Sequence, residues 1–266
     1  MQAGVSTACL YPQLLEESLY ELAVNGITHV EIFFNSESEL RRPFVANLAD
    51  IMERFGVTCK SVHPFACPME PMMLFSRYER RVEDMLEYYK RTFEAMHTLG
   101  AEIFVFHGSD AQHPVPVDLY CERFAKLVRT GKEEGITVAQ ENVVRCQSGQ
   151  LRFLRELALR MGAEAKFVLD IKQAVRAGES PEEILTTLGS RVIHVHLSDH
   201  GEKGDCLPLG TGNFRVRNFL DLLAGCSPES SVILELYRDN FRGISDLVSS
   251  YRMLSMLMRS ATRSPM

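Results

Sequence analysis

The chain has 266 residues, of which 45% are hydrophobic and 24% are charged, and its formal net charge is −6. This composition is ordinary for a soluble globular protein, and the length suits one large α/β domain. The acidic balance argues against nucleic acid as the main partner, because phosphate binding requires a basic surface.

The start of the chain has no basic segment followed by a long apolar one, so we expect no signal peptide. No apolar run approaches the roughly 20 residues of a membrane span. The seven cysteines are scattered and form no C-x-x-C pair, which favours reduced thiols over a disulfide framework. We therefore expect a cytoplasmic protein that binds no membrane.

Strand-like apolar runs alternate with amphipathic helical stretches along the whole chain. The expected strands cover residues 3–9, 29–34, 57–63, 102–107, 136–141, 166–170, 192–197 and 231–236. The expected helices cover residues 12–26, 38–55, 76–99, 117–134, 149–161, a stretch from 180 onward, 213–225 and 243–260. Ser76 and Ser180 each precede a glutamate by three residues, which is the spacing of a capping box. Residues 64–75 are rich in Pro and Met and are a candidate for a mobile active-site loop.

Strict alternation of strand and helix implies a parallel sheet with right-handed crossovers. Eight strand–helix units in about 250 residues predict a closed (β/α)8 TIM barrel, and an open doubly wound sheet is the alternative. No composition shift or linker divides the chain, so we expect residues 1–266 to form a single domain.

Four of the expected strands end in a carboxylate or an imidazole. These residues are Glu141, Asp170, His196 and Glu235. An ionised side chain resists burial unless it is paired or metal-bound, and the carboxyl ends of barrel strands share one rim. Converging carboxylates repel one another unless a cation lies between them. The oxygen and nitrogen donors suit one Mn²⁺, Mg²⁺, Co²⁺ or Zn²⁺ ion; the alternative is four separate rim residues or ion-pair partners.

Other polar residues lie near the same rim. His63 and His107 end two further strands and are expected to bind substrate oxygens or a second metal, unless a neighbouring carbonyl satisfies them. His194 is expected on the opposite face of its strand from His196, in a structural role. We assign no catalytic role to Glu31.

Further candidate residues lie in the segments that follow Asp170 and His196. Lys172 is expected to neutralise a bound anion or to be a solvated surface lysine. Arg217 is a candidate clamp for an anionic group of the substrate, or a helix-surface charge. Asp199 is a candidate to hold a ligand through a hydrogen bond, and Gly210 and Gly212 resemble a phosphate-binding loop only weakly.

The chain resembles the xylose isomerase-like barrels of the sugar phosphate isomerase/epimerase group, which includes the endonuclease IV type. That group carries Glu, Asp, His and Glu at the ends of strands five to eight as ligands of a divalent metal. The four strand-end residues match this set in type and order. The segment HVHLSDHGEKGDCLPLGTGNF resembles the group's metal histidine, following aspartate and LPLG-x-G loop.

Two positions depart from the group's pattern. Gln173 and Cys206 stand where many relatives have histidines that hold further metals or contact substrate. Their presence speaks against the three-metal endonuclease arrangement, and it leaves Gln173 as a candidate substrate-binding residue in place of histidine.

The resemblance implies a divalent-metal-dependent isomerase or epimerase of a sugar, keto-sugar or sugar phosphate. Glu141 and Glu235 would be metal ligands and also the acid and base that move a proton through a metal-stabilised enediolate. The alternatives are an inosose-type dehydratase, an endonuclease IV-like phosphodiesterase and a non-catalytic sugar-binding barrel. Loss of the mass of water from the product would indicate the dehydratase, and a basic groove would indicate the phosphodiesterase. A metal assay would test the non-catalytic barrel. Assembly into a homo-oligomer is left open.

Overall fold

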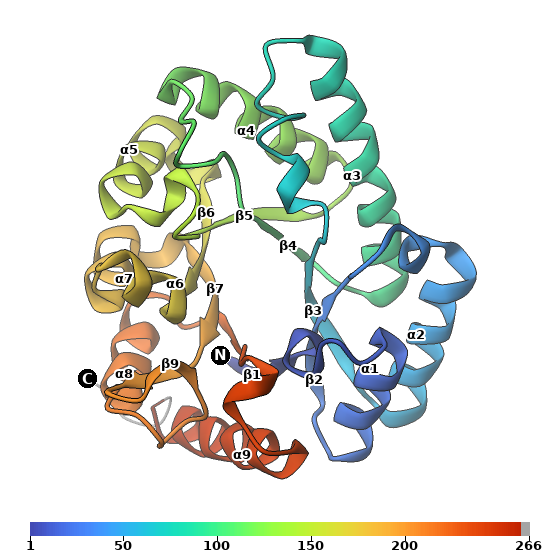
Figure 1. Ribbon diagram of the computed structural model, residues 1–266, viewed down its shortest axis with the longest axis vertical. Coiled ribbons are helices and arrows are strands. Elements are labelled where there is room, and N and C mark those ends of the chain that lie inside the picture. The colour runs from blue at the N-terminus through green and yellow to red at the C-terminus, as the bar shows by residue number, and fades with distance from the viewer. Residues whose placement is uncertain (262–266) are drawn as a thin grey trace.

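Eight parallel strands form a closed barrel in the computed structural model, which describes residues 1–261. The barrel strands are β1 (Gln2–Ser6), β2 (His29–Phe33), β3 (Thr58–His63), β4 (Ile103–Phe106), β5 (Thr137–Glu141), β6 (Lys166–Asp170), β7 (Val192–Leu197) and β10 (Ser231–Leu234). The ring closes where β1 pairs with β10 (Figure 1). The predicted TIM barrel is confirmed, and the alternative of an open sheet is wrong.

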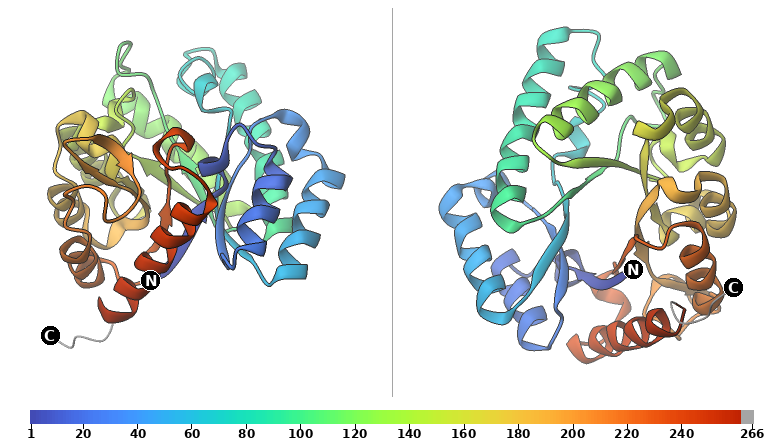
Figure 2. Two further views of the ribbon diagram at one scale, coloured as in Figure 1. Left: turned by 60° about the horizontal axis from the view of Figure 1, so that its bottom comes forward. Right: turned by 180° about the vertical axis from the view of Figure 1, so that it is seen from behind.

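Helices surround the barrel on its outer side, as both views in Figure 2 show. They are α1 (Leu15–Val24), α2 (Arg42–Phe55), α3 (Glu79–Leu99), α4 (Val117–Glu133), α5 (Leu151–Met161), α6 (Ile171–Ala177), α7 (Pro181–Leu188), α8 (Val216–Cys226) and α9 (Ile244–Ala261). Gly56 and Gly100 end α2 and α3 in the left-handed conformation that favours glycine. Within the described residues, no helix has both the length and the apolarity needed to cross a membrane.

Two apolar layers follow from the alternation of side chains along each strand. Outward-facing residues pack on the helices: Phe104 lies 5.3 Å from Phe93 of α3, and Phe106 lies 5.4 Å from Phe124 of α4, measured between ring centroids. A separate, smaller cluster contains Ile103, Val105, Ala139 and Val168. Above this inner cluster, the next inward-facing positions reach the rim where the strands end.

Helix α6 and a small hairpin were missing from the sequence prediction. Helix α6 starts directly after β6, and Asp170 caps it by accepting a hydrogen bond from Gln173 N at 2.9 Å. The hairpin consists of β8 (Asp199–Gly201) and β9 (Gly204–Leu207), which pair antiparallel. Both insertions lie directly after barrel strands, so they shape the rim.

The two predicted helix caps had different outcomes. Ser180 caps α7, since its hydroxyl accepts from Glu183 N at 3.2 Å. The capping box at Ser76 was wrong, because α3 begins only at Glu79 and the Ser76 hydroxyl accepts from Tyr78 N instead.

The segment 64–75 is a loop with one 3-10 turn at Cys67–Met69. It is anchored by Glu70, whose side chain is fully buried. Glu70 accepts hydrogen bonds from the Tyr89 hydroxyl at 2.5 Å and from Gly108 N at 2.6 Å. The candidate mobile loop is therefore tied to α3 and to the end of β4.

Candidate metal centre

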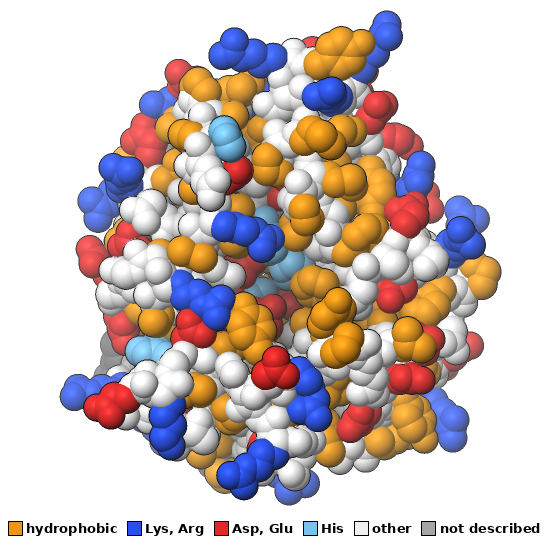
Figure 3. Space-filling model, in the orientation of Figure 1, with side chains coloured by type: hydrophobic (Ala, Val, Ile, Leu, Met, Phe, Trp, Pro, Cys, Tyr) orange, Lys and Arg blue, Asp and Glu red, His pale blue; other side chains and the backbone are white. Residues whose placement is uncertain are grey.

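The ends of β5, β6, β7 and β10 bring four ligand-type side chains together. Ligand atoms of Glu141, Asp170, His196 and Glu235 all lie within 4.8 Å of one another. The distances from His196 Nδ1 are 3.3 Å to Glu141 Oε1, 3.4 Å to Glu235 Oε2 and 3.7 Å to Asp170 Oδ2. Figure 3 shows histidine and acidic atoms at the floor of a hollow near the centre of this face. The four strand-end residues predicted from the sequence thus lie in one cluster.

Two oxygens of this cluster are buried and accept no hydrogen bond, Glu141 Oε2 and Asp170 Oδ2. His107 Nε2 and Lys172 Nζ lie 2.8 and 3.2 Å from them, but without hydrogen-bond geometry. A buried polar atom without a partner is costly, and carboxylate oxygens with one imidazole form a familiar donor set for divalent cations. The residues present therefore fit a divalent metal ion.

Lys172 is the cation nearest to the carboxylates. It is buried, and its ammonium lies 2.9 Å from Glu235 Oε2. Burial alone would lower the pKa of Lys172, but Asp170 and Glu235 hold that pKa well above its ordinary value. The expected binding of a substrate anion is not what the structure shows, because protein carboxylates already neutralise this lysine.

The electrostatics of the cluster favour added positive charge. Burial alone would raise the pKa of Glu235, but Lys172 and His196 lower it to about 2. Burial alone would lower the pKa of His196, but the carboxylates of Glu31 and Glu235 raise it well above its ordinary value. Burial raises the pKa of Asp170. The raised pKa values of His196 and Asp170 follow from burying several carboxylates together, an arrangement that a divalent cation would stabilise.

His63 and His107 form the other side of the mouth. His107 Nε2 lies 2.8 Å from both Glu141 Oε2 and His63 Nε2. Arg145 Nη2 lies 3.2 Å from His107 Nδ1, and a guanidinium only donates, so Nδ1 accepts and Nε2 carries the proton. His63 Nδ1 lies 3.2 Å from the Pro64 carbonyl, which only accepts, so His63 Nε2 is free to accept.

These protonation states favour hydrogen bonding over a second metal at the histidine side. His63, His107 and Glu141 do have ligand atoms within 4.8 Å of one another. A metal on His107 Nε2 would, however, have to displace the proton that the contact with Arg145 places there. Burial also lowers the pKa of His107, so its ring is neutral. No pattern in the sequence pointed to this role of Arg145.

Two predicted substrate-binding residues are engaged elsewhere. The Gln173 side-chain oxygen accepts from Val144 N at 3.1 Å, so it ties α6 to the loop after β5. Arg217 is exposed on α8 and donates to Leu257 O and to the Ser260 hydroxyl of α9. It contacts none of the four strand-end residues, which corrects the expectation of an anion-binding role.

Asp199 closes the glycine-containing loop after β9. Its carboxylate accepts from Gly210 N at 2.9 Å and from Gly212 N and Phe214 N at 3.0 Å. These backbone amides are therefore occupied, which corrects both the phosphate-loop resemblance and the expectation that Asp199 holds a ligand.

Two buried thiols hold the backbone that carries Glu235. Cys206 Sγ donates to Glu235 O at 3.4 Å and accepts from Tyr237 N at 3.2 Å. Cys9 Sγ donates to Leu234 O at 3.4 Å and accepts from Leu236 N at 3.2 Å. The cysteine at position 206 therefore has a structural contact of its own in this chain.

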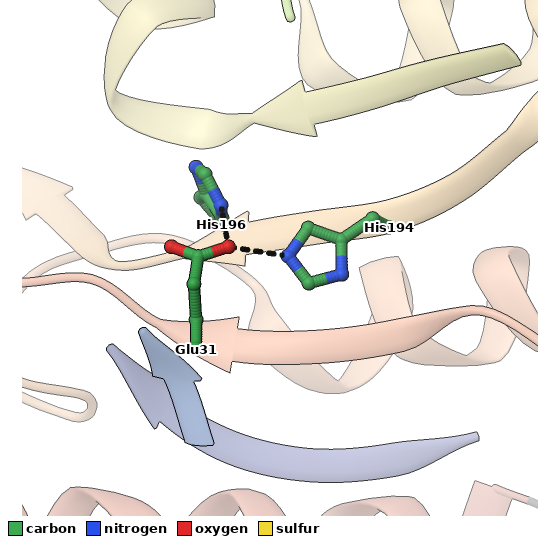
Figure 4. Close-up of side chains that lie close together, drawn as sticks. All are labelled: Glu31, His194 and His196. Atoms are coloured by element: carbon green, nitrogen blue, oxygen red, sulfur yellow. Dashed lines mark hydrogen bonds and ion pairs between the residues drawn. The ribbon is translucent and has the colours of Figure 1, made fainter. Parts of the chain in front are cut away.

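The structure adds Glu31 and His194 to the site. His194 and His196 both lie 3.1 Å from Glu31 Oε2 through their Nε2 atoms (Figure 4). The expectation of opposite faces was wrong, because residues two apart share one face of a strand. A signal was available in the sequence: Glu31 is a carboxylate in the middle of the apolar run VEIFF.

Residues 19–254 match the family model described as Xylose isomerase-like TIM barrel. The chain belongs to this family. Among solved structures, the chain is similar to a D-tagatose 3-epimerase-like protein, with a TM-score of 0.79, 21% identity and 98% of each chain covered. It is also similar to an L-ribulose 3-epimerase, with a TM-score of 0.74 and 16% identity over 99% of this chain and 96% of the other.

A third solved structure is the IOLI protein with a binding zinc atom. Its TM-score is 0.78 and its identity 15%, and the match covers 99% of this chain and 100% of that one. At these identities the three similarities establish the shared fold. Family membership confirms the resemblance that the strand-end residues suggested.

Proposed function

We propose that the protein is a divalent-metal-dependent isomerase or epimerase of a sugar, keto-sugar or sugar phosphate. The observation that carries this proposal is the cluster of three carboxylates and one imidazole in the barrel mouth, with two buried oxygens that accept no hydrogen bond. Two of the similar structures are named as a sugar epimerase or as epimerase-like, and the third holds zinc. A small polar molecule, rather than nucleic acid or a membrane, is the proposed partner.

Glu141, Asp170, His196 and Glu235 would hold the metal. When bound, the ion would supply positive charge that stabilises negative charge developing on the substrate oxygens. The hollow in which these side chains lie is lined by buried groups, so the charge would act with little screening by water.

Glu141 and Glu235 are the proposed acid and base. Strands β7 and β6 separate their strands in the ring, so the two carboxylates stand at opposite ends of the cluster. A substrate carbon between them would present one face to each, which allows one carboxylate to remove a proton and the other to return it. Burial alone would raise the pKa of Glu141, but His107 and its neighbours hold it well below its ordinary value, so Glu141 is available as a base.

Neighbouring groups can exchange protons with this pair. Lys172 contacts Glu235 Oε2 at 2.9 Å, and His107 contacts Glu141 Oε2 at 2.8 Å. His63 stacks on Phe33 with 4.4 Å between ring centroids, which fixes its ring at the mouth. His63 and His107 are the proposed hydrogen-bonding partners of the substrate oxygens, which would replace the contact between their Nε2 atoms.

The test is solvent exchange at the carbon next to the carbonyl. The metal-loaded protein is incubated in D₂O with a panel of ketoses, keto-sugars and their phosphates, and products are followed by NMR and mass spectrometry. The proposal predicts deuterium incorporation and an isomeric product, both lost in Glu141→Gln and Glu235→Gln and both retained in Arg217→Ala. A product lacking the mass of water would indicate a dehydratase, and absence of exchange across the panel would contradict the proposal.

A further inference from the structure

Glu31 lies below the metal centre, inside the barrel. It is in the middle of β2 and is fully buried. No lysine or arginine contact is found for it among the described residues. Instead four donors surround its carboxylate, and Figure 4 shows the two histidines among them. Oε2 of Glu31 lies 3.1 Å from His196 Nε2, 3.1 Å from His194 Nε2 and 2.8 Å from Ser61 Oγ. Oε1 of Glu31 lies 3.2 Å from Ser6 Oγ.

The strand register helps to place these groups on one level. The β2–β3 ladder shifts between Val30 and Glu31, so that Glu31 pairs with Ser61. The β6–β7 ladder shifts between Phe167 and Val168, so that Val168 pairs with His194. Such irregularities re-aim side chains next to functional sites. They set Glu31 and His194 on the same inner layer of the barrel.

Packing alone does not explain a carboxylate at this level. The inward residues two positions before Glu141 and Asp170 are the apolar Ala139 and Val168, which belong to the inner cluster. A buried carboxylate costs free energy that an apolar side chain would not. The position of Glu31 is therefore better explained by what its oxygen contacts.

The contact with Glu31 determines which nitrogen of His196 can bind a cation. An ionised carboxylate only accepts hydrogen bonds, so His196 Nε2 carries the proton. A cation that replaces the other ring proton would therefore bind Nδ1, and Nδ1 is the atom that lies 3.3–3.7 Å from the three carboxylates of the cluster. Hydrogen bonds of this kind are a common way to orient a ligating histidine.

We propose that Glu31 is a positioning residue whose carboxylate fixes the orientation and tautomer of His196, with His194, Ser61 and Ser6 holding that carboxylate in place. This inference rests on the proposed metal centre. Glu31 would touch neither metal nor substrate, and would act only through His196.

The test is metal affinity in the absence of substrate. Glu31→Gln should weaken Zn²⁺ and Co²⁺ binding by about 10–100-fold, the effect typical of an outer partner of a ligand, measured by competition with a chromophoric chelator. The Co²⁺ absorption spectrum of the loaded variant should change, because the imidazole is no longer held in one orientation. Ser6→Ala removes one donor to the other carboxylate oxygen, so its metal affinity should fall by less than that of Glu31→Gln. Arg217→Ala, which changes an exposed residue whose contacts are with α9, is the control expected to bind the ion as wild type does.

A double-mutant cycle separates positioning from a general effect on the fold. In a His196→Ala background, Glu31→Gln should weaken metal binding no further, because the residue through which it acts is gone. Glu31→Asp provides a second variant if the glutamine variant is poorly folded, since it keeps the buried charge but withdraws it from His196. The metal affinity of Glu31→Asp should also be lower than that of wild type.

The outcomes distinguish this inference from the proposed function. If the wild-type protein binds no divalent ion, the metal centre itself is wrong. If wild type binds the ion and Glu31→Gln binds it equally well, the metal centre stands and the role of Glu31 is wrong. Additive losses in the His196→Ala background would also overturn the positioning role.

Discussion

The two sides of the barrel mouth satisfy their buried polar groups in different ways. The carboxylate side, on β5, β6, β7 and β10, gathers Glu141, Asp170, His196 and Glu235, and two of its oxygens accept no hydrogen bond. The histidine side, on β3 and β4, consists of His63 and His107, whose ring nitrogens all have partners. Both sides use the same strand ends, and they share Glu141.

This difference indicates which side of the mouth would hold a cation. On the histidine side, a chain of hydrogen bonds from Arg145 through His107 to His63 assigns each proton. On the carboxylate side, Lys172 and His196 lie against three carboxylates, and two of the carboxylate oxygens still accept no hydrogen bond. A divalent ion would complete the carboxylate side, whereas on the histidine side it would have to break the chain of hydrogen bonds.

Asp170→Asn should have the largest effect, because it removes a charged ligand from the carboxylate side. Metal affinity should fall by more than the roughly 10–100-fold seen for outer partners, and solvent exchange should be lost. Asparagine can still cap α6 in place of the aspartate, so the fold should be kept, which circular dichroism checks. Retained metal affinity would mean that the carboxylates do not form one site.

Lys172→Met should destabilise the metal-free protein most clearly. Removing one partner of a buried ion pair typically costs about 3–5 kcal/mol, so the free energy of unfolding in EDTA should fall by about that amount. Addition of Mn²⁺ should then restore more stability than it adds to wild type, because the ion replaces the lost charge. Denaturation curves with and without the ion measure both quantities; equal curves for the two proteins would contradict this account.

His107→Asn should slow solvent exchange without reducing metal binding. The number of ions bound per chain should not change, whereas solvent exchange should slow by about 10–100-fold, at the lower end of acid–base effects. Dialysis with elemental analysis gives the first quantity, and NMR gives the second. A fall in metal content would place a metal on the histidine side as well.

Glu70→Gln should change the dependence of stability on pH near the histidine side. Burial raises the pKa of Glu70 to about 8, above its ordinary value of 4.5, so the folded state favours the protonated carboxyl. The stability from this group is complete below pH 4.5 and is lost as the pH rises to about 8. As the pH rises between these values, the melting temperature of wild type should therefore fall relative to that of Glu70→Gln. A difference in melting temperature that does not change with pH would count against the raised pKa.

Arg217→Ala should have the smallest effect. Its guanidinium contacts the end of α9 and none of the residues at the mouth. Metal affinity and exchange should match wild type, and only a small loss of stability is expected, as for other surface contacts. A strong loss of substrate binding would restore the role predicted from the sequence.

The sequence predicted the barrel and the four strand-end residues because both depend on local patterns. Apolar runs mark buried strands, and a charge at the end of each run marks the rim. The sequence could not show that Lys172 would face Glu235 or that Asp199 would bind loop amides, since α6 and the β8–β9 hairpin set these contacts. The role of Glu31 depends on the ring order, which brings β2 across the barrel from β7.

The most direct test of the metal centre is the divalent metal content of the purified wild-type protein. After dialysis against buffer containing Mn²⁺ or Zn²⁺ and removal of loosely bound ions, elemental analysis should find one ion per chain, and Asp170→Asn in parallel should retain far less. A wild-type protein that retains no divalent ion would contradict the account.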